Sequence, residues 1–214
     1  MAGITSILHA LKRGTTSVDQ RVEATGRGAS FTQKDLPDYT ELVRSGVVWT
    51  VGEATAVAAV TAPPTTTAGI SLYNDEAEGS GLAYVLLKVF GLQVGASAAL
   101  ASWGISHNIA TIKPTTKPTG DIAASSIKNL RSPSPNYGGK AIVDLAATVT
   151  DDLWKPIGNS TGTVVVSLTG TQIDVLINGM VVVMPGGMYS LKGVASDTGI
   201  TVRLGFVWAE VKLD

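Results

Sequence analysis

The sequence predicts an all-β protein, an antiparallel β-sandwich preceded by an extended N-terminal arm. Three observations lead to this prediction. The apolar residues are mostly Val, Ala, Leu and Ile, and they are mixed with Thr, Ser and Gly, a composition that suits pleated strands. The 24 Gly and 9 Pro provide many turn positions between short strands. Several segments alternate between apolar and polar residues, as half-buried strands do.

Composition excludes several classes of protein. Only 15% of the 214 residues are charged and the formal net charge is −1, so the chain lacks the basic field of a dedicated nucleic-acid binder. It has no cysteine, which excludes disulfides, cysteine zinc sites and cysteine nucleophiles and fits a reducing compartment. No uncharged run reaches the roughly 18 apolar residues that a membrane helix needs. The start of the chain also lacks the residue order of a signal peptide. We therefore expect a soluble protein that is not secreted and has no membrane partner.

The chain divides into two parts. Residues 1–46 are polar, with charges of both signs, and are expected to form an extended arm. A helix over Ile4 to Lys12, and a short helical turn capped by Asp38, are alternatives within this arm. Residues 47–214 are expected to form the β domain. Its long connection over residues 113–140 is rich in Pro, Thr, Ser and Gly, which predicts a functional loop or a crossover between sheets.

Two predicted strands carry apolar residues beyond what one core needs. In residues 83–94 both faces are apolar, so a second layer or another subunit is expected to cover the second face. In the last strand the apolar phase switches after Trp208, which indicates a bulge or a strand that leaves its own core. We expect subunit contacts from these strands at Tyr84, Leu86, Phe90, Leu92, Val211 and Leu213.

The most hydrophobic stretch, residues 173–191, contains Asn178-Gly179 between two apolar runs. Asn-Gly is the preferred pair for a two-residue hairpin turn, because both turn positions need a positive φ. A turn there pairs Ile177 with Met180 and continues with apolar pairs on one face. With a second turn at Pro185-Gly186-Gly187, the stretch is predicted to be three short strands.

Candidate catalytic groups are few. Gly158 to Gly162 matches the G-x-S-x-G pattern around Ser160, but a strand is expected after it and both histidines, His9 and His107, precede it. A Gly/Ser turn is therefore preferred over a nucleophile elbow. Adjacent carboxylates such as Asp151 and Asp152 point opposite ways on an extended chain and make a poor acid/base pair. We expect no enzymatic activity, no catalytic residue and no cofactor.

Metal binding is also weakly supported. His9 and His107 are far apart in sequence and have no local histidine partner, so a cupin-like metalloenzyme is not expected. Asp75, Glu76 and Glu78 form an acidic loop without the spacing of an EF-hand, and a solvated turn is preferred there. Whether this loop binds a cation stays open. The tryptophans fall at or near strands, and core packing is expected for them.

The polar arm and the Val/Thr/Ala/Gly-rich strands resemble virion proteins of tailed bacteriophages, the capsid cement or decoration proteins. Residues 68–94 and 170–214 carry this resemblance. It implies a jelly-roll-like sandwich, a homotrimer, and a capsid-bound protein made in the host cytoplasm whose partner is the major capsid protein. The arm is expected to fold on that partner. Its candidate capsid-binding residues are Arg21, Arg27, Phe31, Leu36 and Tyr39.

The alternative function is a phage fibre or receptor-binding module that recognises carbohydrate. In that hypothesis Trp154 and the connection 113–140 form the candidate glycan surface.

Overall fold

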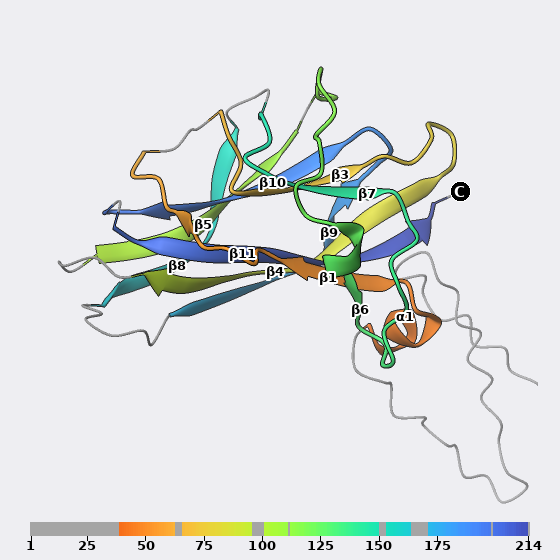
Figure 1. Ribbon diagram of the computed structural model, residues 1–214, viewed down its shortest axis with the longest axis horizontal. Coiled ribbons are helices and arrows are strands. Elements are labelled where there is room, and N and C mark those ends of the chain that lie inside the picture. Colours follow the sequence, from red (N-terminus) through yellow and green to blue (C-terminus); the bar gives the residue numbers. More distant parts are fainter. Residues whose placement is uncertain are drawn as a thin grey trace, which may run out of the picture.

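The computed structural model describes residues 39–62, 66–95, 101–110, 112–149, 153–163, 171–197 and 199–213. These ranges form two antiparallel sheets that pack face to face (Figure 1). The predicted all-β antiparallel sandwich is therefore confirmed. Most of the predicted arm, with the alternative helix over Ile4 to Lys12, lies outside the described residues. Within the described residues, no helix is long and apolar enough to span a membrane.

Each sheet is named here after its central strand. The β11 sheet contains, in spatial order, β6 (Lys128–Asn129), β1 (Val48–Gly52), β11 (Thr201–Lys212), β4 (Leu82–Gly95) and β9 (Gln172–Val183), and β2 (Val57–Ala58) also pairs with β11. The β10 sheet contains β7 (Ala141–Leu145), β3 (Ile70–Asn74), β10 (Met188–Ala195), β5 (Ala101–Ile109) and β8 (Trp154–Thr163). The helices are α1 (Thr40–Ser45) and the 3₁₀ helix η1 (Ala124–Ser126).

The long strands pair in a nested order. β1 pairs with β11, β3 with β10, β4 with β9, and β5 with β8. This is the order produced when one long antiparallel hairpin rolls up into two sheets, as the double-sheet jelly rolls do. The jelly-roll-like fold itself stays a prediction.

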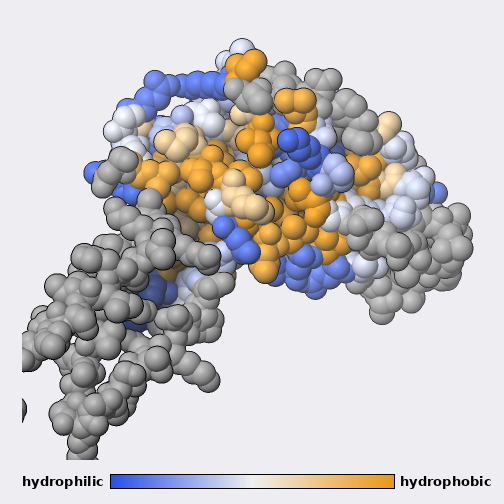
Figure 2. Space-filling view, turned by 180° about the vertical axis from the view of Figure 1, so that it is seen from behind, coloured by the Kyte–Doolittle hydropathy of each residue, from blue (hydrophilic) through white to orange (hydrophobic). Residues whose placement is uncertain are grey.

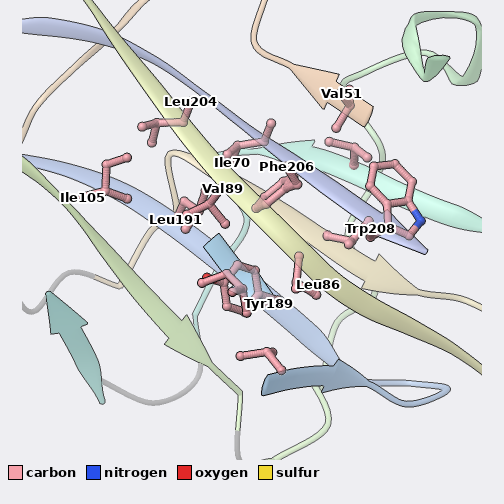
Figure 3. Close-up of a cluster of buried hydrophobic side chains, with 14 of the residues drawn as sticks. Val51, Ile70, Leu86, Val89, Ile105, Tyr189, Leu191, Leu204, Phe206 and Trp208 are labelled. Atoms are coloured by element: carbon pink, nitrogen blue, oxygen red, sulfur yellow. The ribbon is translucent and has the colours of Figure 1, made fainter. Parts of the chain in front are cut away.

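The main core lies between the two sheets (Figure 3). Its largest fully buried side chains are Trp208, Tyr84, Tyr189 and Phe206. Aromatic rings pack edge to face inside it, with 5.9 Å between the ring centroids of Tyr189 and Phe206. The expected core packing is confirmed for Trp49, Trp103 and Trp208, which are 8%, 2% and 0% exposed.

A second, smaller cluster covers the outer face of the β11 sheet. It is built on Val48, Leu87 and Ala209, and helix α1 lies against it through Leu42 and Val43. Figure 1 shows α1 on the side of the β11 sheet that faces away from β10. The second layer expected over residues 83–94 is therefore supplied, for this part of β4, by the chain itself.

Asn178 and Gly179 do not turn the chain. They have φ angles of 51° and 77°, so the positive φ expected at both positions is found. Yet residues on either side pair with the same strand, Val181 with Leu86 and Leu176 with Lys88, and β9 runs on in one direction. The predicted hairpin is wrong, because both flanks find their hydrogen-bond partner in β4 and the extra residues between them form a bulge. The second turn is where it was predicted, with Gly186 at φ 79° and the Gly187 N–H donating to the Met184 carbonyl.

The connection 113–140 contributes to the core. Ile127 and Tyr137 are 2% and 9% exposed and belong to the main cluster. The Tyr137 ring packs edge-on against Trp49, with 4.8 Å between the centroids. These two core residues left no sign in the sequence, since single large residues in a Pro-rich stretch form no periodic pattern.

Residues 154–163 form strand β8, so the Gly/Ser turn expected around Ser160 is also wrong. Gly158 is required by close packing there, because an added Cβ would lie 2.8 Å from the Ile173 side chain. The strand predicted after this turn, over residues 162–168, falls mostly outside the described residues.

Candidate functional site

The six predicted subunit-contact residues do not share one surface. Tyr84 and Leu86 are fully buried between the sheets, so the prediction that they meet a second chain is wrong. A β-bulge separates these two residues from Phe90 and Leu92. The register of β4 shifts between Leu86 and Lys88 in its pairing with β11 and in its pairing with β9. After the bulge the odd-numbered Val89 faces the core, so the even-numbered Phe90 and Leu92 face outward.

The other four predicted contact residues lie toward the outside. Phe90 is half-buried and its ring covers the backbone at Gly52 and Gly205. Leu92 is 40% exposed. Val211 packs against the cluster under α1, and the Leu213 N–H donates to the Gly81 carbonyl. Their contact with another subunit stays a prediction.

The most exposed apolar side chains of the β11 sheet lie on its edge strand, β9. Leu176, Met180 and Val182, together called the β9 stripe here, are 61%, 80% and 40% exposed. Ile177 and Val181, which lie among them in sequence, face the core. Soluble proteins rarely leave contiguous apolar surface uncovered at a sheet edge. Figure 2 shows hydrophobic side chains gathered in a broad area across one face of the molecule.

A second exposed apolar group lies where β5 ends and β8 begins. Asn108 pairs with Trp154 at this point. Ile109 and Leu153 flank that pair and are 43% and 60% exposed, and Ile112 follows at 63%. This end of the β10 sheet therefore also presents apolar side chains to solvent.

Of the five candidate capsid-binding residues, Tyr39 alone lies within the described residues. Its hydroxyl donates a hydrogen bond of 2.6 Å to Asn178 Oδ1, and its ring packs toward the cluster under α1. Arg21, Arg27, Phe31 and Leu36 lie outside the described residues. Tyr39 thus belongs to the folded domain, at the middle of the β9 stripe.

Trp154, the candidate glycan-binding residue, borders a cavity of about 380 Å³ on the β10 sheet. Hydroxyl-bearing residues of the lining are Ser102, Ser106 and Ser196. Trp154 is half-buried and also packs against a small cluster that contains Val149 and Met188. The connection 113–140 is absent from the cavity lining, so the structure does not bring it together with Trp154 there.

The acidic loop is paired with lysines of the connection 113–140. Lys113 Nζ lies 2.6 Å from Glu78 Oε1, and Lys117 Nζ lies 2.5 Å from Asp75 Oδ2. The Lys113 ammonium holds the pKa of the exposed Glu78 carboxyl below its usual value. Within the described residues, no group of three or more His, Asp and Glu side chains is arranged to hold a metal ion. The structure supports the solvated ion-paired loop.

One carboxylate is buried without a full set of partners. Glu53 is 5% exposed, and its Oε2 accepts a hydrogen bond of 2.7 Å from the Leu204 N–H. Its Oε1 has no hydrogen-bond partner among the described residues. Burial raises the pKa of Glu53 to about 7, although the Leu204 N–H and the nearby Lys192 ammonium act to lower it. Sequence reasoning missed this group, since a single Glu after a strand carries no pattern.

A partly buried carboxylate, Glu210, lies on β11. The Tyr137 hydroxyl donates to Glu210 Oε1 at 2.5 Å and accepts from the Ala141 N–H at 2.8 Å. Burial raises the pKa of Glu210, and the hydrogen bonds from Tyr137 and Trp208 oppose that rise. This cluster joins the connection 113–140 to the core and has the form of a structural polar network.

Comparison with known proteins leaves the family open. No protein-family model matches the sequence, and no curated protein matches it. Among solved structures, the chain has a likeness to one described as the structure of deformed wing virus carrying the GFP gene. The identity is 11%, the match covers 94% of this chain and 89% of that chain, and the TM-score is 0.20. At this TM-score the likeness carries no argument about fold or function.

Proposed function

We propose that this chain is a non-enzymatic structural protein of a virion, a cement or decoration protein that binds and stabilises the major capsid shell. In this proposal it acts as a homotrimer on the capsid surface, after synthesis in the host cytoplasm. The residues before Tyr39 form the arm that reaches the capsid, with Arg21 and Arg27 as its cationic contacts.

One observation carries the proposal. Three exposed large apolar residues, Ile109, Ile112 and Leu153, gather where β5 ends and β8 begins. Such grouped apolar surface is typical of proteins that are covered by other protein chains. Leu92, on the outer face of β4, is the predicted subunit-contact residue that remains most exposed.

The oligomer is tested by native mass spectrometry of the full chain at micromolar concentration. A trimer supports the proposal, and a clean monomer contradicts the homotrimer. The arm is tested by sedimentation with capsids. A chain that begins at Asp38 keeps α1 and every described strand, so it should fold and fail to co-sediment. Unimpaired capsid binding by that chain would contradict the arm's role.

A carbohydrate-binding module is the second candidate, and the cavity beside Trp154 favours it. An indole next to serine hydroxyls gives the apolar face and the hydrogen-bonding groups with which proteins hold sugars. Trp154 is half-buried and packs against the cluster that contains Val149 and Met188.

Glycan-array binding separates the two candidates. Binding that is lost in Trp154→Ala and kept in Trp154→Phe supports a sugar site. The matched control is Leu153→Ala, because Leu153 is the adjacent residue, is 60% exposed and does not line the cavity. Absence of glycan binding by the wild-type chain would reject this candidate and leave the structural proposal untouched.

A further inference from the structure

The β9 stripe lies on the outer face of the β11 sheet. Helix α1 covers another part of that face and leaves the stripe uncovered. Helix α1 packs over β1, β11 and the first part of β4. The outer face of the next strand, β9, presents Leu176, Met180 and Val182 to solvent. The β9 stripe is therefore continuous with the apolar surface that α1 covers.

The described chain begins at the middle of this stripe. The Tyr39 hydroxyl is bonded to Asn178, which lies two residues from Leu176 on one side and two from Met180 on the other. Val182 pairs with Val85, and both Val85 and Tyr39 pack against the cluster under α1. Residues that precede Tyr39 must therefore start beside the stripe.

The sequence before Tyr39 supplies apolar residues within reach. It is S-F-T-Q-K-D-L-P-D over residues 30–38, with Leu36 three residues before Tyr39. Three residues of chain span at most about 11 Å. Leu176 is two strand residues from Asn178, about 7 Å along β9. Pro37 also favours an extended backbone at Leu36.

We propose that residues 30–38 dock in cis on the β9 stripe, with Leu36 covering the apolar side chains of β9. The segment extends the outer layer that α1 begins and shields the sheet edge. The proposal does not rest on the proposed virion function. If both hold, the arm available to a capsid partner is residues 1–29.

Disulfide trapping tests the proposal directly, because the chain has no cysteine to remove. Leu36→Cys is combined in turn with Leu176→Cys, Met180→Cys and Val182→Cys in the full chain. After mild oxidation at low micromolar concentration, non-reducing electrophoresis separates internal disulfides from linked dimers. We expect an internal disulfide in high yield with at least one of the three partners. The β9 positions are exposed, so these substitutions leave the core intact.

The matched control is Leu36→Cys with Ser196→Cys. Ser196 is exposed at the far end of the sandwich, where β11 begins opposite Gly95. Gly95 lies seven residues along β4 from Lys88, about 23 Å from the Asn178 bulge. An internal yield severalfold above this control supports the proposal. Equal yields, no disulfide with any β9 position, or disulfide-linked dimers would each overturn it; dimers would assign the stripe to a second copy.

Methionine oxidation gives a second readout on the unmodified sequence. Met180 is 80% exposed, and Met184, which is 49% exposed, lies beyond the stripe. Under dilute peroxide, we expect Met180 to oxidise several times more slowly in the full chain than in a chain that begins at Asp38. Met184 should change little. Equal rates for Met180 in the two chains would overturn the proposal.

Discussion

The ring of Phe90 lies on the backbone of Gly205, its partner residue on the neighbouring strand. A Cβ added at Gly205 would overlap this ring and would lie 2.5 Å from the Val51 carbonyl oxygen. Gly205→Ala should therefore force the ring and the β1 backbone to move, and it should lower the free energy of unfolding by about 1–3 kcal/mol. Urea unfolding measures this loss.

The control for this substitution is Gly138→Ala. Gly138 has no heavy atom within 4 Å of an added Cβ. Its replacement should leave stability unchanged or raise it slightly, since Ala reduces the entropy of the unfolded chain. Equal effects of the two substitutions would contradict the close packing of Phe90 on Gly205.

The buried Glu53 predicts a loss of stability as the pH rises. Its ordinary pKa is 4.5 and burial raises it to about 7, so the folded chain holds this proton more tightly than the unfolded chain does. Well below pH 4.5 the carboxyl is protonated in both states and does not affect the free energy of unfolding. As the pH rises to about 7 the folded state is progressively destabilised, by about 3 kcal/mol at most.

Glu53→Gln isolates this effect, because Gln keeps the acceptor for the Leu204 N–H and does not titrate. The wild-type chain should lose stability relative to Glu53→Gln between pH 4.5 and 7, measured by urea unfolding at several pH values. A difference between the two chains that stays constant with pH would contradict the raised pKa.

The Tyr137 hydroxyl joins Glu210 to the Ala141 backbone. Tyr137→Phe leaves the ring in place against Trp49, but it removes a donor from the partly buried Glu210 carboxylate and an acceptor from the partly buried Ala141 N–H. We expect a loss of about 1–3 kcal/mol in the free energy of unfolding. Tyr39→Phe, which removes an exposed hydrogen bond, should cost less. A larger cost at Tyr39 would contradict this ranking.

We expect the proposed subunits to meet at Leu92. Leu92→Asp places a charge on the outer face of β4 without entering the core, so the fold should persist while a trimer dissociates. The control is Leu130→Asp, since Leu130 is 46% exposed against 40% for Leu92. Light scattering measures both. A trimer that survives Leu92→Asp would move the subunit contact away from this residue.

The positive φ angles at Asn178 and Gly179 were predictable from the sequence. That the chain continues in one direction there, without a hairpin turn, was not. An Asn-Gly pair accepts a positive φ at both positions, and it does so here. Whether such a pair turns the chain depends on what its flanks bond to, and both flanks bond to β4. The predicted hairpin placed Met180 and Val182 on a buried face with Ile177. The exposed β9 stripe was missed for that reason.

The faces of β4 show the same limit. The apolar residues on both faces correctly predicted that a second layer covers the strand, and α1 is that layer over Leu87. Period-two alternation then assigned Tyr84, Leu86, Phe90 and Leu92 to one face. A single bulged residue separates them into two buried and two outward residues. When both faces are apolar, the sequence has no contrast from which to locate such a bulge.

The nested pairing has a consequence for how the protein is made. Among the described strands, β1 pairs over its full length with β11. The Thr50 hydroxyl donates a hydrogen bond to the Phe206 carbonyl, 156 residues later in the chain. Such distant contacts slow folding, because a long loop must close before they form. On the ribosome, α1 and β1 are synthesised before the other described strands. β1 can pair with β11 only after all of those strands have emerged, because β11 follows them in the chain. The N-terminal region is thus the last part of the sandwich to be secured.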